Sequence, residues 1–141
     1  MFYLIVILAG LSGLCQADLA VGNGSQSSTY VTTQTGLQLL DSTLGTGETA
    51  QSGDVVSVHY VGKLADGTIF DSSRKRQQRF VFILGKGQVI PGWEEGVVGM
   101  QVGGVRELII PSALAYGNQD LGVIPPNSTL YFEVELVSVT H

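Results

Sequence analysis

The side chains of this 141-residue chain that could do chemistry together lie mainly within residues 58–96. This span holds five large aromatic side chains, Tyr60, Phe70, Phe80, Phe82 and Trp93, the only tryptophan. Clustered aromatic rings with a few polar groups are typical of a pocket that binds an apolar ligand group. Asp71 directly follows one ring, and Arg76 comes soon after it. Taken alone, these two could form a catalytic pair, although an ion pair at a strand end explains them more simply.

The sequence offers little for covalent, metal or cofactor chemistry. Its two histidines, His59 and His141, stand at positions that do not indicate a pair, and no His and Cys spacing fits a zinc site. No nucleotide-binding or nucleophile motif occurs. Glu94 and Glu95 favour a helix start over an acid/base dyad. We therefore expect no metal and no cofactor, and a reaction that needs neither.

Composition indicates one globular domain, because 141 residues with 44% hydrophobic and 13% charged side chains suffice to bury a single core. Nineteen glycines and four prolines between short apolar runs favour a mainly β architecture with tight turns. The net charge of −5 argues against a nucleic-acid partner, which requires a basic surface. We interpret the one basic cluster as a solvated loop between two strands; it comprises Arg74, Lys75, Arg76 and Arg79.

Apolar alternation predicts the secondary structure. Strands are expected at residues 37–40, 54–63, 68–71, 80–84, 105–110 and 129–139. Asp66 and Gly67 predict a hairpin turn. Residues 91–98 can hold one short helix, with Pro91 in its first turn. Together these elements predict an α+β fold in which an antiparallel sheet of about five strands wraps around one short α-helix.

The amino-terminal segment, residues 1–17, resembles a signal peptide, because it is almost wholly apolar and ends with small residues at a cleavage spacing. We therefore expect export to the extracellular space, the endoplasmic reticulum lumen, the periplasm or an organelle lumen. The mature form should have no stable membrane span, and an N-terminal membrane anchor is the alternative. Residues 18–35 are polar and Gly-rich and predict a flexible linker. The folded domain is expected to occupy residues 36–141.

Over roughly residues 35–139 the chain closely resembles the FKBP-type peptidyl-prolyl cis/trans isomerases. Besides the aromatic span, the resemblance rests on Tyr116-Gly117, on the V-I-P-P run at 123–126 and on T-L-Y-F-E-V-E-L at 129–136. It implies an enzyme that rotates X-Pro bonds in polypeptides, assists protein folding and needs no cofactor. It also implies that tacrolimus and rapamycin compete for the pocket, and we expect a monomer.

This reaction suits a chain without a nucleophile, because rotating an X-Pro bond breaks no σ bond. The barrier of roughly 18 to 20 kcal/mol arises because the twist removes amide resonance. An apolar pocket penalises the planar amide, which is more polar than the twisted one, while a few donors hold the flanking carbonyls. A thousandfold to hundred-thousandfold acceleration would require about 4 to 7 kcal/mol of such differential binding.

The resemblance also implies a role for each pocket residue. The walls would be Tyr60, Phe70, Phe80, Val89, Ile90 and Phe132. Trp93 would form the floor beneath the proline ring, and Val123 and Ile124 the rim. Judged singly, each aromatic residue is better explained as a core residue of a β face, and only the complete set in family order reverses that preference in favour of a pocket.

Three polar groups complete the site that the resemblance implies. The Tyr116 hydroxyl and the backbone N–H of Ile90 would donate hydrogen bonds to substrate carbonyls. Asp71, held by Tyr60 and Arg76, would direct its charge toward the twisting amide. We thus expect Phe70, Asp71, Trp93 and Tyr116 to carry catalysis.

Two functions without catalysis remain open. The first is a binding module or chaperone that holds Pro-containing segments, and the second is a secreted adhesion or glycan-binding domain. A peptide isomerisation assay separates all three functions. The loop at residues 118–122 is one residue shorter than in the single-domain cytosolic members of the family that the chain resembles, which leaves its partner preference open. Asn23 and Asn127 lie in glycosylation sequons that are used only in a eukaryotic secretory route.

Overall fold

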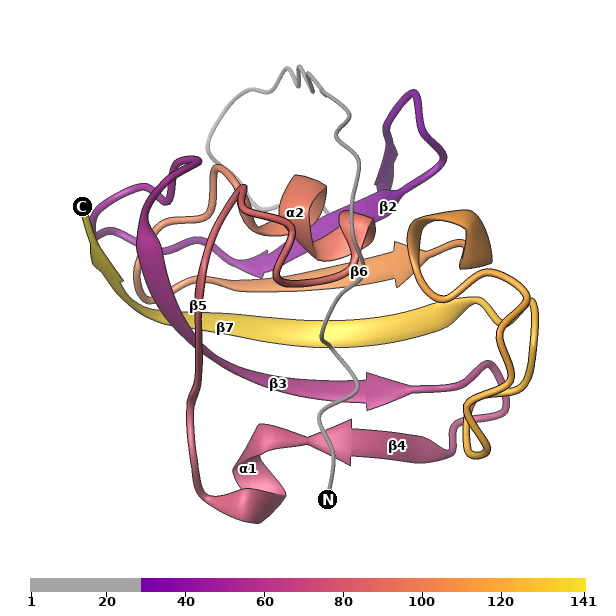
Figure 1. Ribbon diagram of the computed structural model, residues 1–141. Coiled ribbons are helices and arrows are strands. Elements are labelled where there is room, and N and C mark those ends of the chain that lie inside the picture. The colour runs from indigo at the N-terminus through magenta and orange to yellow at the C-terminus, as the bar shows by residue number, and fades with distance from the viewer. Residues whose placement is uncertain (1–28) are drawn as a thin grey trace.

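In the computed structural model, which describes residues 29–141, the sheet is organised around β3 (Val55–Lys63), a strand rich in β-branched side chains. β3 pairs along one side with β7 (Leu130–Thr140). Along its other side, the first half of β3 pairs with β5 (Phe80–Ile83) and the second half with β4 (Ile69–Ser72). The strand therefore has neighbours on both sides over most of its length (Figure 1).

The sheet continues from β7 through β6 (Val105–Ile110) and β2 (Gln38–Thr43) to β1 (Val31–Thr32), and every pair is antiparallel. The predicted antiparallel fold is confirmed, but the sheet has seven strands and not about five. The added edge strand, β1, lies within the segment that we expected to be a linker. Its pairing to β2 and a 2.6 Å hydrogen bond from the Tyr30 hydroxyl to Glu107 order this polar stretch.

The helix α2 (Pro91–Val97) packs against one face of the sheet, as predicted (Figure 1). Two of its residues are glycines that face β6. A Cβ atom at Gly92 would lie 2.5 Å from Cγ2 of Ile110, and one at Gly96 would lie 2.7 Å from Cδ2 of Leu108. The helix backbone can therefore approach the strand more closely than a helix with larger side chains would allow.

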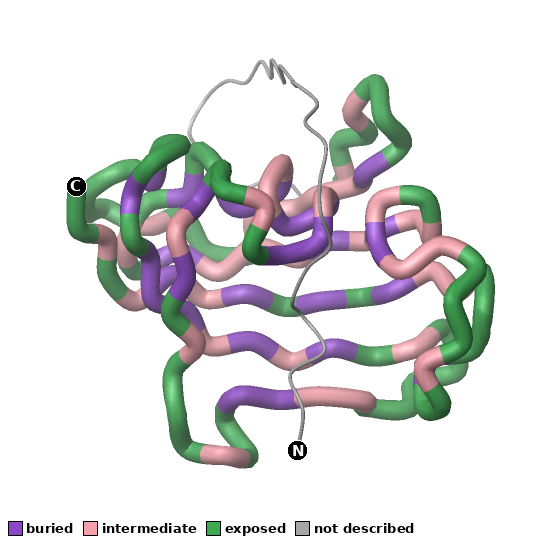
Figure 2. Tube along the Cα trace, viewed as in Figure 1, coloured by how far each residue is buried: buried purple, intermediate pink, exposed green. Residues whose placement is uncertain are grey.

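The two faces of the sheet differ in burial, which Figure 2 shows as alternating colours along the central strands. On β7 the inner residues are buried, namely Leu130, Phe132, Val134 and Leu136. The intervening Tyr131 and Glu133 are exposed on the outer face, and Glu135 beside them is half-buried. On β3, Tyr60 faces the core while His59 faces outward. The predicted alternation is confirmed, and the core lies between the sheet and α2.

The basic segment between β4 and β5 differs from the solvated loop that we expected, because its first half forms the helical turn α1 (Ser73–Arg76). The Ser72 hydroxyl accepts a hydrogen bond from the backbone of Lys75 at the amino end, and Gln77 ends the turn with a left-handed φ of 56°. The turn brings the Ser73 hydroxyl to 2.8 Å from the backbone nitrogen of Tyr60. The Ser73 hydroxyl thereby accepts a hydrogen bond from a β3 amide that lies between the part of β3 paired with β4 and the part paired with β5.

The predicted signal peptide at residues 1–17 lies outside the described residues. Within residues 29–141, no helix is long and apolar enough to cross a membrane. In the same part of the chain, no three His, Cys, Asp or Glu side chains are grouped so that they could hold a metal ion.

Candidate active site

Trp93, on α2, lies at the centre of an aromatic cluster, and its side chain is fully buried. Its ring centroid lies 5.2 Å from that of Tyr60 and 5.3 Å from that of Phe132, with interplanar angles of 84° and 85°. Phe82 and Phe80 follow at 5.7 and 6.1 Å. Edge-to-face pairs of this kind place the positive edge of one ring against the negative face of another. The structure thus brings the predicted aromatic residues together.

Phe70, on the edge strand β4, joins this cluster through Phe132, at 5.6 Å and 87°. Both rings lie against Gly62 of β3, where a Cβ atom would be 2.7 Å from Cζ of Phe70 and 2.8 Å from Cε1 of Phe132. Sequence reasoning missed Gly62. A glycine inside a strand of β-branched residues often marks a close approach of this kind, and that signal could have revealed it.

Asp71 binds both of the partners that were expected for it. The Tyr60 hydroxyl donates to Oδ2 at 2.6 Å, and Nη1 of Arg76 donates to Oδ1 at 2.5 Å. Nη2 of Arg76 also donates to the Tyr60 oxygen at 3.0 Å. The Asp71 side chain is only 7% exposed and that of Arg76 is 25% exposed. The three groups therefore form a closed hydrogen-bonded network at the edge of the aromatic cluster.

The environment of this network shifts two pKa values. Burial raises the pKa of the Tyr60 hydroxyl well above its usual range, the hydrogen bond to Asp71 raises it further, and Arg76 partly opposes the shift. Burial lowers the pKa of Arg76, but its hydrogen bonds to Tyr60 and Asp71 outweigh that effect and raise it overall. The tyrosine therefore stays neutral and the arginine stays charged at any pH near neutrality.

Two buried donors beside the network have no hydrogen-bond partner among the described residues. They are Nε1 of Trp93 and the hydroxyl of Tyr116, which follows the short 3₁₀ helix η1 (Ser112–Leu114). Burial also raises the pKa of Tyr116, with smaller contributions from the charges of Tyr60 and Asp71. A buried polar group without a partner costs free energy, so such groups are expected where a ligand supplies the acceptor.

The aliphatic residues of the predicted pocket divide into two kinds. Val89, Ile90 and Ile124 are at most 2% exposed and belong to the core. Ile90 also begins α2 as its N-cap residue, where backbone N–H groups are not used within the helix. Val123 is 55% exposed, so the two neighbours that we expected to share the rim lie in different environments.

The carboxylates of α2 do not form an acid/base dyad. Glu94 accepts hydrogen bonds from the backbone of Gly85 at 2.5 Å and of Gly87 at 2.7 Å. Glu95 accepts one from the Thr35 hydroxyl at 2.7 Å. Both side chains thus connect neighbouring segments to the helix. This agrees with the prediction that the pair belongs to a helix start and not to an acid/base dyad.

Comparison with known proteins identifies the family. Residues 46–137 match the family described as "FKBP-type peptidyl-prolyl cis-trans isomerase", and these residues make up more than half of the chain. The chain therefore belongs to the FKBP-type peptidyl-prolyl cis-trans isomerase family.

Curated relatives agree with this assignment. FK506-binding protein 2 of Yarrowia lipolytica is 62% identical over 91 residues, which are 64% of this chain and 63% of that protein. FK506-binding protein 4 of Neurospora crassa is 52% identical over 104 residues, which are 74% of this chain and 22% of that protein. The chain therefore spans less than two thirds of the length of either relative.

Solved structures show the same fold. The crystal structure of FkpA from Escherichia coli superimposes with a TM-score of 0.75 at 43% identity, covering 81% of this chain and 53% of that one. The crystal structure of AtFKBP13 gives a TM-score of 0.73 at 37% identity, covering 78% of this chain and 98% of that one.

Proposed function

We propose that this protein is a peptidyl-prolyl cis/trans isomerase that accelerates rotation about X-Pro bonds in polypeptides and so assists their folding. The observation that carries the proposal is the buried aromatic cluster around Trp93, which stands beside two buried donors without partners. Membership of the isomerase family and the high identity to FK506-binding proteins support the same function.

The aromatic cluster supplies the apolar surroundings that this reaction needs. The proline ring rests on Trp93, between Tyr60 and Phe132, where little water accompanies the amide. Twisting the amide removes its resonance and part of its polarity, so an apolar site destabilises the planar form relative to the twisted one. Rotation requires no proton transfer and no covalent intermediate.

The polar groups hold the substrate while its amide twists. The Tyr116 hydroxyl, which has no acceptor among the described residues, donates a hydrogen bond to a carbonyl that flanks the proline. Asp71 does not act as a base, because both of its oxygens already accept hydrogen bonds from Tyr60 and Arg76. Its carboxylate is a fixed charge at the edge of the site.

The natural setting of the protein is also part of this proposal. Tacrolimus and rapamycin occupy the aromatic cluster and compete with proline-containing polypeptides, in keeping with the names of the FK506-binding relatives. The protein acts as a monomer. The signal-like residues 1–17 direct it into the secretory pathway or across a bacterial or organelle membrane.

The full-length protein should accelerate cis/trans exchange of an X-Pro peptide, and most strongly when a bulky apolar residue precedes the proline. The reason for this preference is the half-buried ring of Phe70 at the edge of the aromatic cluster, which the core residues Val89, Ile90 and Ile124 support from behind. NMR exchange spectroscopy on peptides with Leu or Glu before the proline measures both rates, and tacrolimus should abolish the acceleration. Folded protein that binds the peptide without accelerating exchange would indicate a chaperone instead.

The catalytic efficiency kcat/KM toward an uncharged peptide should be nearly constant between about pH 6 and 9, within a factor of roughly two. Burial raises the pKa of both Tyr60 and Tyr116, so both hydroxyls stay protonated throughout this range. His59 lies on the opposite face of the sheet. A pH-dependent step in kcat/KM within this range that His59→Gln removes would contradict the mechanism proposed above.

A further inference from the structure

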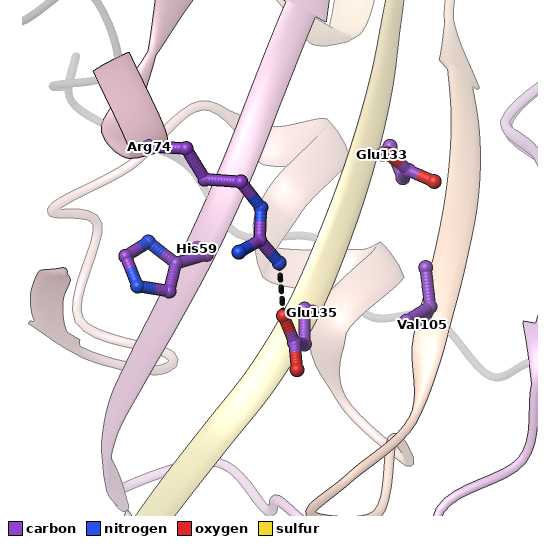
Figure 3. Close-up of a pocket in the computed structure, with 5 residues that line it drawn as sticks. All are labelled: His59, Arg74, Val105, Glu133 and Glu135. Atoms are coloured by element: carbon purple, nitrogen blue, oxygen red, sulfur yellow. Dashed lines mark hydrogen bonds and ion pairs between the residues drawn. The ribbon is translucent and has the colours of Figure 1, made fainter. Parts of the chain in front are cut away.

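A polar cleft lies on the outer face of the sheet, opposite the aromatic cluster. It has a volume of about 330 Å³ and is lined by His59 of β3, Arg74 of α1, and Gln77 and Arg79 of the segment that leads to β5. A smaller hollow shares His59 and Arg74 and continues across β7 and β6 (Figure 3). None of the residues lining this cleft belongs to the candidate active site.

The four side chains that line the outer cleft each carry a hydrogen-bond donor. The smaller hollow beside it also presents the carboxylates of Glu133 and Glu135. Nδ1 of His59 lies 2.9 Å from the hydroxyl of the fully buried Ser73, which fixes the imidazole ring against α1. Arg79 is exposed and forms no ion pair within residues 29–141. The side-chain amide of Gln77 likewise forms no hydrogen bond within that range. Two guanidinium groups, an imidazole and an amide thus surround one hollow.

Of the two guanidinium groups, that of Arg74 is engaged, but only weakly. Arg74 reaches over β3 and binds the carboxylate of Glu135 on β7 (Figure 3). The two side chains are 54% and 34% exposed. Exposed ion pairs of this kind typically contribute between zero and about 1 kcal/mol. An anion with better hydrogen-bond geometry can therefore displace Glu135 from Arg74 at a small cost in free energy.

The local charge favours such an anion in a chain whose net charge is −5. Arg74 and Arg79 line the cleft and Lys75 belongs to the same helical turn, whereas Arg76 is paired with Asp71 on the opposite face. A carboxylate has two acceptor oxygens, whereas a phosphoryl group has three and carries nearly two charges at neutral pH. Guanidinium forks match the oxygen spacing of a phosphoryl group, and separate donors can bind its remaining oxygens.

We propose that the outer cleft is a binding site for a phosphoryl group, held by Arg74, Arg79 and His59. The group is either free phosphate or the phosphate of a phosphorylated side chain on a partner polypeptide. Glu135 acts as the competing internal ligand, because it occupies Arg74 when the cleft is empty. This site goes beyond the proposed isomerase function and does not depend on it.

The test is an NMR titration of the isotope-labelled full-length protein at constant ionic strength. The probes are inorganic phosphate, a phosphoserine peptide without proline and the same peptide with serine. Saturable shifts are expected at the amides of His59, Gln77 and Arg79 with the first two probes only. Tighter binding of the phosphopeptide would assign the phosphoryl group to a partner polypeptide, and equal affinities would assign the site to the free ion.

Four substitutions separate a built site from general attraction by positive charge. Arg79→Gln and Arg74→Gln should each weaken binding roughly fivefold, and Glu135→Gln should strengthen it. Lys75→Gln is the matched control, because it removes one charge from the same turn at a residue that does not line the cleft. Equal weakening by Lys75→Gln and Arg79→Gln, or no saturable shift in the cleft, would overturn the proposal.

Discussion

Replacing Trp93 with alanine should lower the free energy of unfolding by about 3 to 5 kcal/mol and abolish measurable isomerase activity. The side chain is fully buried, and its ring contacts those of Tyr60, Phe80, Phe82 and Phe132. Truncation removes the packing of the core and also, under the proposed function, the floor on which the proline ring would rest. Urea denaturation followed by circular dichroism measures the first effect, and peptide exchange measures the second.

The matched control for this substitution is Tyr131→Ala, because Tyr131 is an aromatic residue of the outer face that is 37% exposed. Its truncation should change the free energy of unfolding by less than about 1 kcal/mol and leave the exchange rate unchanged. If Trp93→Ala keeps the stability of the unsubstituted protein, the ring is not packed as the structure shows. If it keeps the activity, the aromatic cluster is not the site of rotation.

Tyr116→Phe should lower kcat/KM roughly tenfold while leaving the free energy of unfolding unchanged or slightly higher. The Tyr116 hydroxyl is buried without a partner among the described residues, so folding gains nothing from it. The substrate carbonyl that it would bind loses one donor in the variant. Parallel measurements of chemical denaturation and of peptide exchange test both parts of this expectation.

Tyr60→Phe provides the contrast, because the Tyr60 hydroxyl donates to Asp71 and accepts from Arg76. Removing it leaves two charged groups with one partner fewer and should cost about 1 to 3 kcal/mol of stability. Equal loss of stability in Tyr60→Phe and Tyr116→Phe would show that the Tyr116 hydroxyl has a structural partner in solution. Unchanged activity in Tyr116→Phe would remove this hydroxyl from the mechanism.

The pattern of the sequence predicted most of the strands closely. The 105–110 strand was predicted at the bounds of β6, and the bounds of β3 and of α2 differ from prediction by a single residue at one end. The turn at Asp66 and Gly67 also forms, with Gly67 at a φ of 91°. These elements were predictable because alternation, turn residues and a proline at a helix start act over a few neighbouring residues.

The errors lie where contacts between distant segments decide the conformation. Val31 and Thr32 stand in a stretch that is too polar to predict a strand. β1 forms nevertheless, because the edge of β2 is available for pairing. The turn α1 forms because the Tyr60 amide requires an acceptor that Ser73 supplies. Neither requirement can be read from the local sequence, because each partner lies on another strand.

The candidate site shows the same division. The sequence by itself determined which residues could build an aromatic pocket, because their types and order match the FKBP-type family, and it determined the absence of a nucleophile motif. Only the tertiary structure decided that Gly62 makes room for two rings and that Val123 is exposed. It also decided that Arg74 and Arg76 form their ion pairs on opposite faces of the sheet. Side-chain packing joins residues that are distant along the chain, and local patterns carry no information about such distances.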